Sequence, residues 1–108
     1  MPTRAMRARI ERVEVRLAAA ASHRERRELG AFVRFCVGRL ERELAPSDHW
    51  IVTIVPDPAG GYASRVIAER RGEVLQAGGS GRDGTLAAWD ALGKVEQALR
   101  EASSRWAH

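Results

Sequence analysis

The order of the periodic segments constrains the fold of this chain more than any other feature. Apolar residues alternate as in a strand over residues 12–17 and repeat with helical spacing over 22–44. Strand-like patterns follow over 49–77, and a second helical repeat closes the chain. An order of strand, helix, three strands and helix within 108 residues predicts one two-layer α+β domain. This order excludes most enzyme folds of the same size.

Two segments in the first half carry clear periodicity. Val13, Val15 and Leu17 alternate with charged residues, which predicts a half-buried strand. Ser22 and Glu25 have the spacing of a capping box at the start of a helix that Pro46 terminates. The apolar stripe of this helix is expected to comprise Leu29, Phe32, Val33, Cys36, Val37, Leu40 and Leu44.

Three more strands are expected at residues 49–55, 62–70 and 73–77. Their short connections predict an antiparallel meander. Gly78–Gly84 is expected to form a flexible loop, with Asp83 as the N-cap of the last helix. The core-facing stripe of that helix is predicted to be Ala88, Leu92, Val95, Leu99, Ala102 and Trp106. The predicted architecture is a four-stranded sheet with two helices packed on one face.

The predicted domain spans residues 1–108, and residues 1–8 are expected to be a ragged basic start. No segment reaches the roughly 20 apolar residues that a membrane span requires. The single cysteine, Cys36, excludes a disulfide framework and favours a reducing cytoplasm. A cytoplasmic protein without a membrane anchor is therefore expected.

The glycine-rich segment resembles a phosphate-binding motif only superficially. Gly79–Gly84 matches the GxGxxG pattern of dinucleotide-binding loops. That function requires a second parallel strand and an acidic residue about 20 positions further on, and the sequence offers neither. Backbone N–H groups at the start of the last helix remain an alternative phosphate site, which the carboxylate of Asp83 would oppose.

No group of residues has the spacing of a catalytic or metal site. Cys36 lies on an apolar stripe and is expected to be a buried, inert thiol. His23, His49 and His108 are scattered along the chain without metal-ligand spacing. We therefore expect a protein that is not an enzyme and that uses no metal, cofactor or small-molecule substrate.

The positive charge is concentrated at one end of the chain. The net charge is +4, and the whole excess of basic over acidic residues falls within residues 1–45. All basic residues except Lys94 are arginine, a side chain suited to bidentate phosphate contacts and to stacking on bases. A basic N-terminal half favours an anionic partner.

The end of the sequence resembles a known family. The segment Asp83–Asp90, followed by Lys94–Arg100, is similar to the Asp-x-Tyr-Ala-Ala-Ile-Asp and Lys-Leu-Glu-x-x-Leu segments of ribosome hibernation-promoting factors. These proteins are also called ribosome-associated stationary-phase inhibitors. The element order and the Tyr62–Gly79 hairpin resemble that family too, so the similarity extends over residues 10–102. The double-stranded-RNA-binding domain is a weaker match, because its basic run at the last helix is missing.

The resemblance implies a short-form factor that binds rRNA of the small ribosomal subunit at the decoding region and inhibits translation during stress or stationary phase. Arginines of the first helix would contact phosphates, helped by residues near the last helix and on the third strand. The candidate RNA-binding residues are Arg24, Arg27, Arg34, Arg65, Arg82, Lys94 and Arg100.

Two alternatives use the same scaffold. Both faces of the strand at residues 49–55 are apolar, with Trp50, Val52 and Ile54 on one side and the intervening residues on the other. This pattern favours a protein–protein interaction module, for example one that forms a homodimer through the open face of the sheet. The third hypothesis is an enzyme that holds a phosphate-bearing ligand at the glycine-rich segment, for which the sequence supplies no catalytic base.

Overall fold

Six elements follow each other in the predicted order. The computed structural model describes residues 12–44 and 47–106, with side chains described as far as Ala102. Residues 1–8 and His108 thus lie outside the described residues. The elements are β1 (Val13–Leu17), α2 (His23–Glu43), β2 (His49–Pro56), β3 (Tyr62–Arg70), β4 (Glu73–Gly81) and α3 (Gly84–Trp106).

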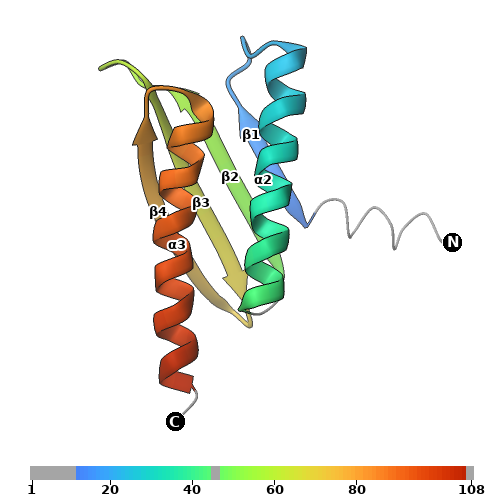
Figure 1. Cartoon of the computed structure of the whole chain (residues 1–108), viewed down its shortest axis with the longest axis vertical. Coiled ribbons are helices and arrows are strands. Elements are labelled where there is room, and N and C mark those ends of the chain that lie inside the picture. Colours follow the sequence, from blue (N-terminus) through green and yellow to red (C-terminus); the bar gives the residue numbers. More distant parts are fainter. Residues whose placement is uncertain (1–11, 45–46, 107–108) are drawn as a thin grey trace, which may run out of the picture.

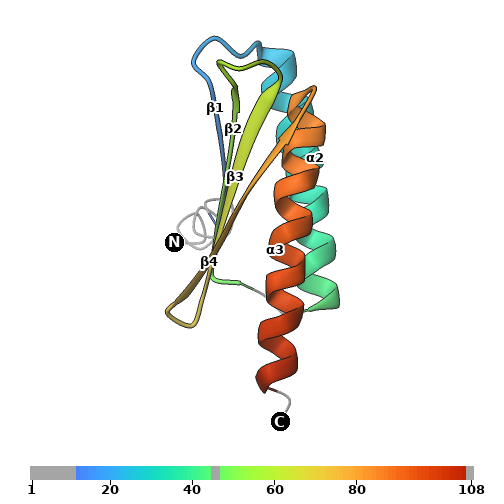
Figure 2. The same cartoon turned by 90° about the vertical axis from the view of Figure 1, so that its left-hand side faces the viewer.

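The four strands form one mixed sheet in the order β1-β2-β3-β4 (Figure 1). β1 pairs with β2 in parallel, whereas β2, β3 and β4 form the predicted antiparallel meander. Parallel pairing of β1 and β2 requires a crossover, and α2 provides it. Both helices lie on the same side of the sheet (Figure 2). The predicted α+β two-layer architecture is confirmed.

The core lies between the sheet and the two helices. Val13 and Val15 of β1 pair with Trp50 and Val52 of β2, so these side chains share the face that the helices cover. Trp50 is fully buried in this layer. The apolar stripes predicted for both helices supply the other side of the core. Trp106, a predicted member of the second stripe, lies beyond the last described side chain. The buried members are Leu29, Val33, Cys36, Val37, Leu40, Ala88, Leu92, Val95, Leu99 and Ala102.

Side-chain caps begin both helices as predicted. The Ser22 hydroxyl accepts a hydrogen bond from the Glu25 backbone N–H at 3.1 Å. The Asp83 carboxylate accepts one from the Leu86 N–H at 2.9 Å. Each cap satisfies an N–H group that has no partner within its helix.

The glycine-rich segment is a strand and not the predicted loop. β4 continues to Gly81, so only Arg82 and Asp83 connect it to α3. A Cβ atom at Gly79 would lie 2.3 Å from the backbone nitrogen of Ala91, and one at Gly81 would lie 2.6 Å from that of Ala87. The glycines are therefore where the backbone of α3 approaches the strand. The loop prediction was wrong because this close approach is not encoded in local composition.

The short turn between β3 and β4 is confirmed. Arg71 has φ of 50° and Gly72 has φ of 81°, so both central residues are in the left-handed region. Two such residues define the hairpin turn whose twist matches that of the flanking strands. This turn fixes the register between β3 and β4.

A half-buried cluster joins β1, α2 and β2 at the end of the domain opposite the β1–α2 loop. The guanidinium of Arg12 forms a bidentate ion pair with Glu41, with an Nη2–Oε1 distance of 2.7 Å. Arg12 also donates to the Ser47 carbonyl at 2.8 Å, and the Ser47 N–H donates to Glu41 at 3.0 Å. Burial alone would raise the pKa of Glu41, but the hydrogen bonds from Arg12 and Ser47 outweigh it and lower that pKa.

We predict that Gly79→Ala destabilises the protein while Gly78→Ala does not. The Cβ at position 79 would collide with the backbone of α3, and overpacking of this kind costs roughly 1–3 kcal/mol. A Cβ at position 78 would meet only the Ser64 carbonyl, at an ordinary 3.7 Å. Urea unfolding followed by circular dichroism measures both free energies. Equal stabilities would contradict close packing of α3 on β4.

We predict a second stability effect at Glu41, and it depends on pH. The pKa of this carboxyl is lower in the folded than in the unfolded chain. Its contribution is therefore complete above the ordinary value of about 4.5 and is lost as pH falls through the folded-state pKa. Glu41→Gln should cost about 1–3 kcal/mol at pH 7. Urea titrations should show this difference shrinking below pH 4.5; a constant difference would contradict the assignment.

Candidate functional site

The solvent side of α2 carries a row of arginines. Arg24, Arg27, Arg34 and Arg42, here called the arginine face, follow each other at intervals that return to one side of a helix. All four residues are exposed, on the side opposite the buried stripe. Arg42 was not among the predicted site residues, although its spacing from Arg34 was available in the sequence.

The members of the arginine face differ in their partners. Arg24 pairs with Glu28 at 2.9 Å, and its side chain is 80% exposed. Among the described residues, Arg27, Arg34 and Arg42 have no ion pair or side-chain hydrogen bond. The guanidinium of Arg34 lies over Gly30. Three cations on one helix are thus left without an acidic partner in the described chain.

A ring of alternating charges holds α2 to α3 and involves Arg100. Arg100 contacts Glu96 at 2.8 Å and Glu43 at 3.3 Å. Arg39 contacts the same two acids, at 3.3 Å for Glu96 and 3.4 Å for Glu43. The hydrogen bond from Arg100, followed by that from Arg39, lowers the pKa of Glu96. Arg100 of α3 therefore links the two helices through its ion pair with Glu43 of α2.

Lys94 is also engaged within the fold. Its ammonium donates to the Gly78 carbonyl at 3.2 Å and lies 3.4 Å from Asp90. Asp90 in turn accepts from the Ser80 N–H at 3.0 Å. The Ser80 bond and then the Lys94 bond lower the pKa of Asp90. These two side chains of α3 cover part of the exposed edge of β4, which would otherwise offer unpaired backbone groups.

The two other predicted residues lie apart from α2. Arg65 projects from β3 on the open face of the sheet, where it donates to Gln76 at 3.0 Å. It lines a shallow depression together with Lys94. Arg82 lies exposed in the β4–α3 connection and has no ion pair within the described residues. The structure thus groups Arg24 with Arg27 and Arg34, and Arg65 with Lys94, and separates these two groups.

The open sheet face is neither continuously basic nor continuously apolar. Arg16 and Arg65 are separated by Thr53 in one cross-strand row. In the next row, Ile51 pairs with Ile67, and both are partly exposed. This face can therefore contact a protein or an anion only over short stretches.

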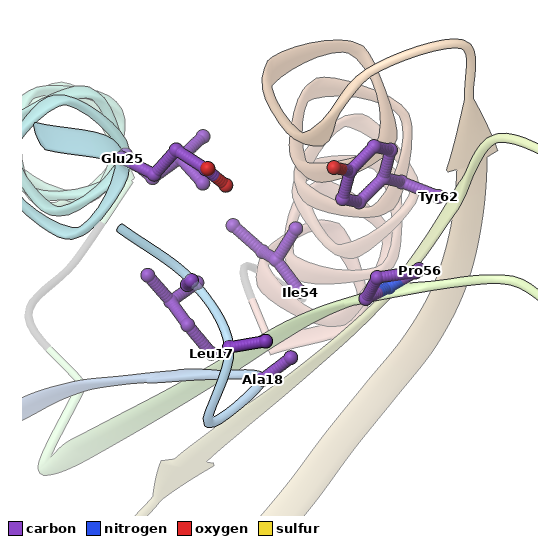
Figure 3. A pocket seen from close by; sticks show the side chains of 9 residues that line it. Leu17, Ala18, Glu25, Ile54, Pro56 and Tyr62 are labelled. Carbon is purple, nitrogen blue, oxygen red and sulfur yellow. The ribbon is translucent and has the colours of Figure 1, made fainter. Parts of the chain in front are cut away.

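A small pocket lies where β1 and β2 end and α2 begins (Figure 3). Its volume is about 180 Å³, and Leu17, Ile54 and Pro56 give it an apolar lining. Glu25 and Tyr62 point toward each other from opposite sides (Figure 3). The described residues that line this pocket include no lysine or arginine, and the carboxylate of Glu25 would repel an anion. The pocket includes no residue of the glycine-rich segment 78–84, at which the sequence placed a phosphate-bearing ligand, and that alternative stays a prediction.

Cys36 is buried, as predicted, with 2% of its surface exposed. Burial raises the pKa of its thiol, and Arg39 opposes this effect only in part. Within residues 12–44 and 47–102, no group of three or more histidine, cysteine, aspartate or glutamate side chains could hold a metal ion. No helix in the described chain is long and apolar enough to span a membrane. The absence of enzymatic activity and of a cofactor stays a prediction.

Comparison with known proteins identifies the fold. No protein-family model and no curated protein matches the sequence. The N-terminal domain of Protein Y from Thermus thermophilus superposes with a TM-score of 0.58 at 14% identity, covering 82% of this chain and 94% of that domain. A ribosomal subunit interface protein from Coxiella burnetii gives a TM-score of 0.61 at 9% identity, covering 85% and 97%.

These similarities confirm the predicted resemblance at the level of fold. Both solved structures are of hibernation-factor type, and each superposes on more than four fifths of this chain. At 14% and 9% identity they show a common architecture and assign no residue of this chain to a function. The functional argument must therefore come from the residues themselves.

We predict that Cys36 in the folded protein reacts slowly with a thiol reagent such as Ellman's reagent. Its burial limits access, and the raised pKa keeps the sulfur protonated at neutral pH. The reaction should become fast in urea at the concentration where circular dichroism reports unfolding. Rapid reaction in the absence of urea would contradict the position of Cys36 in the core.

Proposed function

We propose that this chain is a cytoplasmic, ribosome-associated binding protein that contacts rRNA of the small subunit and inhibits translation during stress or stationary phase. The fold supports the proposal, because it is shared with a protein described as a ribosomal subunit interface protein. The observation that carries it is the arginine face, where Arg27, Arg34 and Arg42 have no acidic partner among the described residues.

The arginine face has the dimensions of a phosphate-binding surface. Arg27 and Arg42 are 15 positions apart, which corresponds to about 22 Å along a helix. Such a length allows contacts to several phosphates of an RNA strand. Arginine binds phosphate through a planar fork of donors, and each contact releases condensed counterions. Binding by this surface should therefore weaken steeply as salt increases.

The positions of the acidic residues determine which basic residues are neutralised and which are not. Glu43 and Glu96 occupy the junction between α2 and α3, where they neutralise Arg39 and Arg100. Asp90 neutralises Lys94 at the edge of β4. On α2 itself, Glu43 and Glu41 pair away from the arginine face, whereas the exposed Glu28 pairs with Arg24 on it. The positive charge of the arginine face that has no acidic partner among the described residues is therefore that of Arg27, Arg34 and Arg42.

A homodimer through the open sheet face is the second proposal. The cross-strand pair Ile51 and Ile67 leaves apolar surface there, and Val74 of β4 is 55% exposed. Charged residues interrupt this surface, so we favour the RNA contact through α2. Sedimentation equilibrium of the purified protein tests self-association.

We predict that the double variant Arg27→Glu/Arg34→Glu no longer co-sediments with small ribosomal subunits. Reversal replaces two phosphate contacts by two repulsions, while both exposed side chains leave the core untouched. The parent protein should pellet at both low and near-physiological salt. Circular dichroism and thermal melting verify that the variant remains folded.

The matched control is Arg16→Glu/Arg71→Glu. Both doubles change the net charge from +4 to 0. Arg16 lies on β1 and Arg71 in the β3–β4 turn, so neither is on α2. The control should pellet like the parent. Equal losses in the two doubles would indicate generic attraction, and unchanged pelleting of the α2 variant would refute the proposed surface.

A further inference from the structure

The helical layer exposes aromatic side chains next to the arginines. Among the described residues, the large apolar side chains that are most exposed are Phe35 at 68%, Trp89 at 56%, Val74 at 55% and Leu86 at 41%. All of these except Val74 belong to the two helices. A helix that only faces solvent does not need exposed aromatic side chains, so their presence beside cations indicates an interaction surface.

The aromatic residues form a row that runs from α2 to α3. The rings of Phe32 and Trp89 lie 6.3 Å apart between centroids, at an interplanar angle of 44°. Phe35 follows Phe32 by one helical turn and is more exposed than it. We call Phe32, Phe35 and Trp89 the aromatic row. Phe32 packs partly against the core, so it anchors the row to the fold.

Phe35 lies within reach of the arginine face. Ala31 and Gly38, one turn before and after it on the helix, are too small to shield the ring. A guanidinium nitrogen of Arg42 lies over Gly38, 3.5 Å from where a Cβ would be. Arg34 precedes Phe35 directly. The guanidinium groups of Arg34 and Arg42 and the exposed side chain of Phe35 therefore occupy the same stretch of α2.

We propose that the aromatic row stacks on unpaired bases of RNA while the arginine face holds the adjoining phosphates. This inference rests on the proposed function and deepens it, because it names single-stranded RNA as the ligand. Base pairing and stacking hide the base faces in a duplex, whereas unpaired segments expose them to aromatic side chains. Stacking also tolerates any base, since every base has a π-face.

Charge argues against a second copy of the chain as the occupant. A two-fold symmetric contact centred on Phe35 would bring the arginine face of one copy against that of the other. The exposed acid beside this face, Glu28, already pairs with Arg24. Arg27, Arg34 and Arg42 of each copy would therefore outnumber the acids that could offset this repulsion within the described part of α2. RNA provides both the flat apolar surface and the negative charge that this region requires.

The test compares Phe35→Leu/Trp89→Leu with Val74→Leu, a matched apolar change on β4. Leucine keeps the apolar character but removes the π-face. Fluorescence anisotropy would measure binding to an unstructured RNA of about 12 nucleotides, which is within the range of single-strand site sizes. The same-length duplex and an abasic strand of equal charge are the reference ligands.

The aromatic double should bind the unstructured RNA at least 10-fold more weakly than the parent, because each stacked base contributes roughly 5- to 150-fold. Its affinity for the abasic strand and its salt dependence should stay unchanged. Arg27→Glu/Arg34→Glu should instead weaken binding to all ligands and lower the log–log salt slope, by about 0.7 per lost contact to a single strand. Val74→Leu should behave as the parent.

The inference would be overturned if the aromatic double variant bound unstructured RNA as tightly as the parent does. It would also be overturned if this variant lost as much affinity for the abasic strand as for the unstructured RNA, or if the parent protein did not bind the oligonucleotide. In each of these cases the proposed function still stands if small subunits pellet the parent but not the arginine variant. A separate result would refute the proposed function: the parent protein does not co-sediment with small ribosomal subunits.

Discussion

The close contact between α3 and β4 is the constraint on which the rest of the structure depends. Gly79 and Gly81 have no side chain, and Ala87, Ala88 and Ala91 of α3 are fully buried. Small residues on both elements allow a helix backbone to approach a strand backbone. Larger side chains at these positions would lift α3 from the sheet and disturb every contact that α3 makes with α2.

The position of α3 in turn arranges the surface that both helices share. Trp89 meets Phe32 because α3 lies beside α2, and Glu96 reaches Arg39 for the same reason. Asp90 and Lys94, on the flank toward β4, bond to backbone groups of Ser80 and Gly78. One helix thus completes the core, covers a sheet edge and brings an aromatic ring next to those of α2.

Most of the fold could be predicted because its determinants are local. The alternation of Val13, Val15 and Leu17 and the caps at Ser22 and Asp83 are each read within a few residues. The extension of β4 through its glycines could not be predicted in this way, because glycine is depleted in strands. The glycines are needed here because a helix that follows later in the chain packs closely on the strand. Tertiary contact overrode the local preference.

The candidate site was predictable in part, and the difference between paired and unpaired cations explains why. Arg24, Lys94 and Arg100 each have an acid four residues away on the same helix, a spacing at which side chains meet.

By contrast, Arg27, Arg34 and Arg42 have no acid at three or four positions on either side. The presence or absence of an acid at this spacing could have separated the paired from the unpaired cations by sequence alone. The contact of Arg100 with Glu43 could not be read in the same way, since these residues are 57 positions apart. Net charge therefore says less about an RNA-binding surface than the positions of the acids do: a helix with both signs of charge presents unpaired cations where no acid lies one turn away from an arginine.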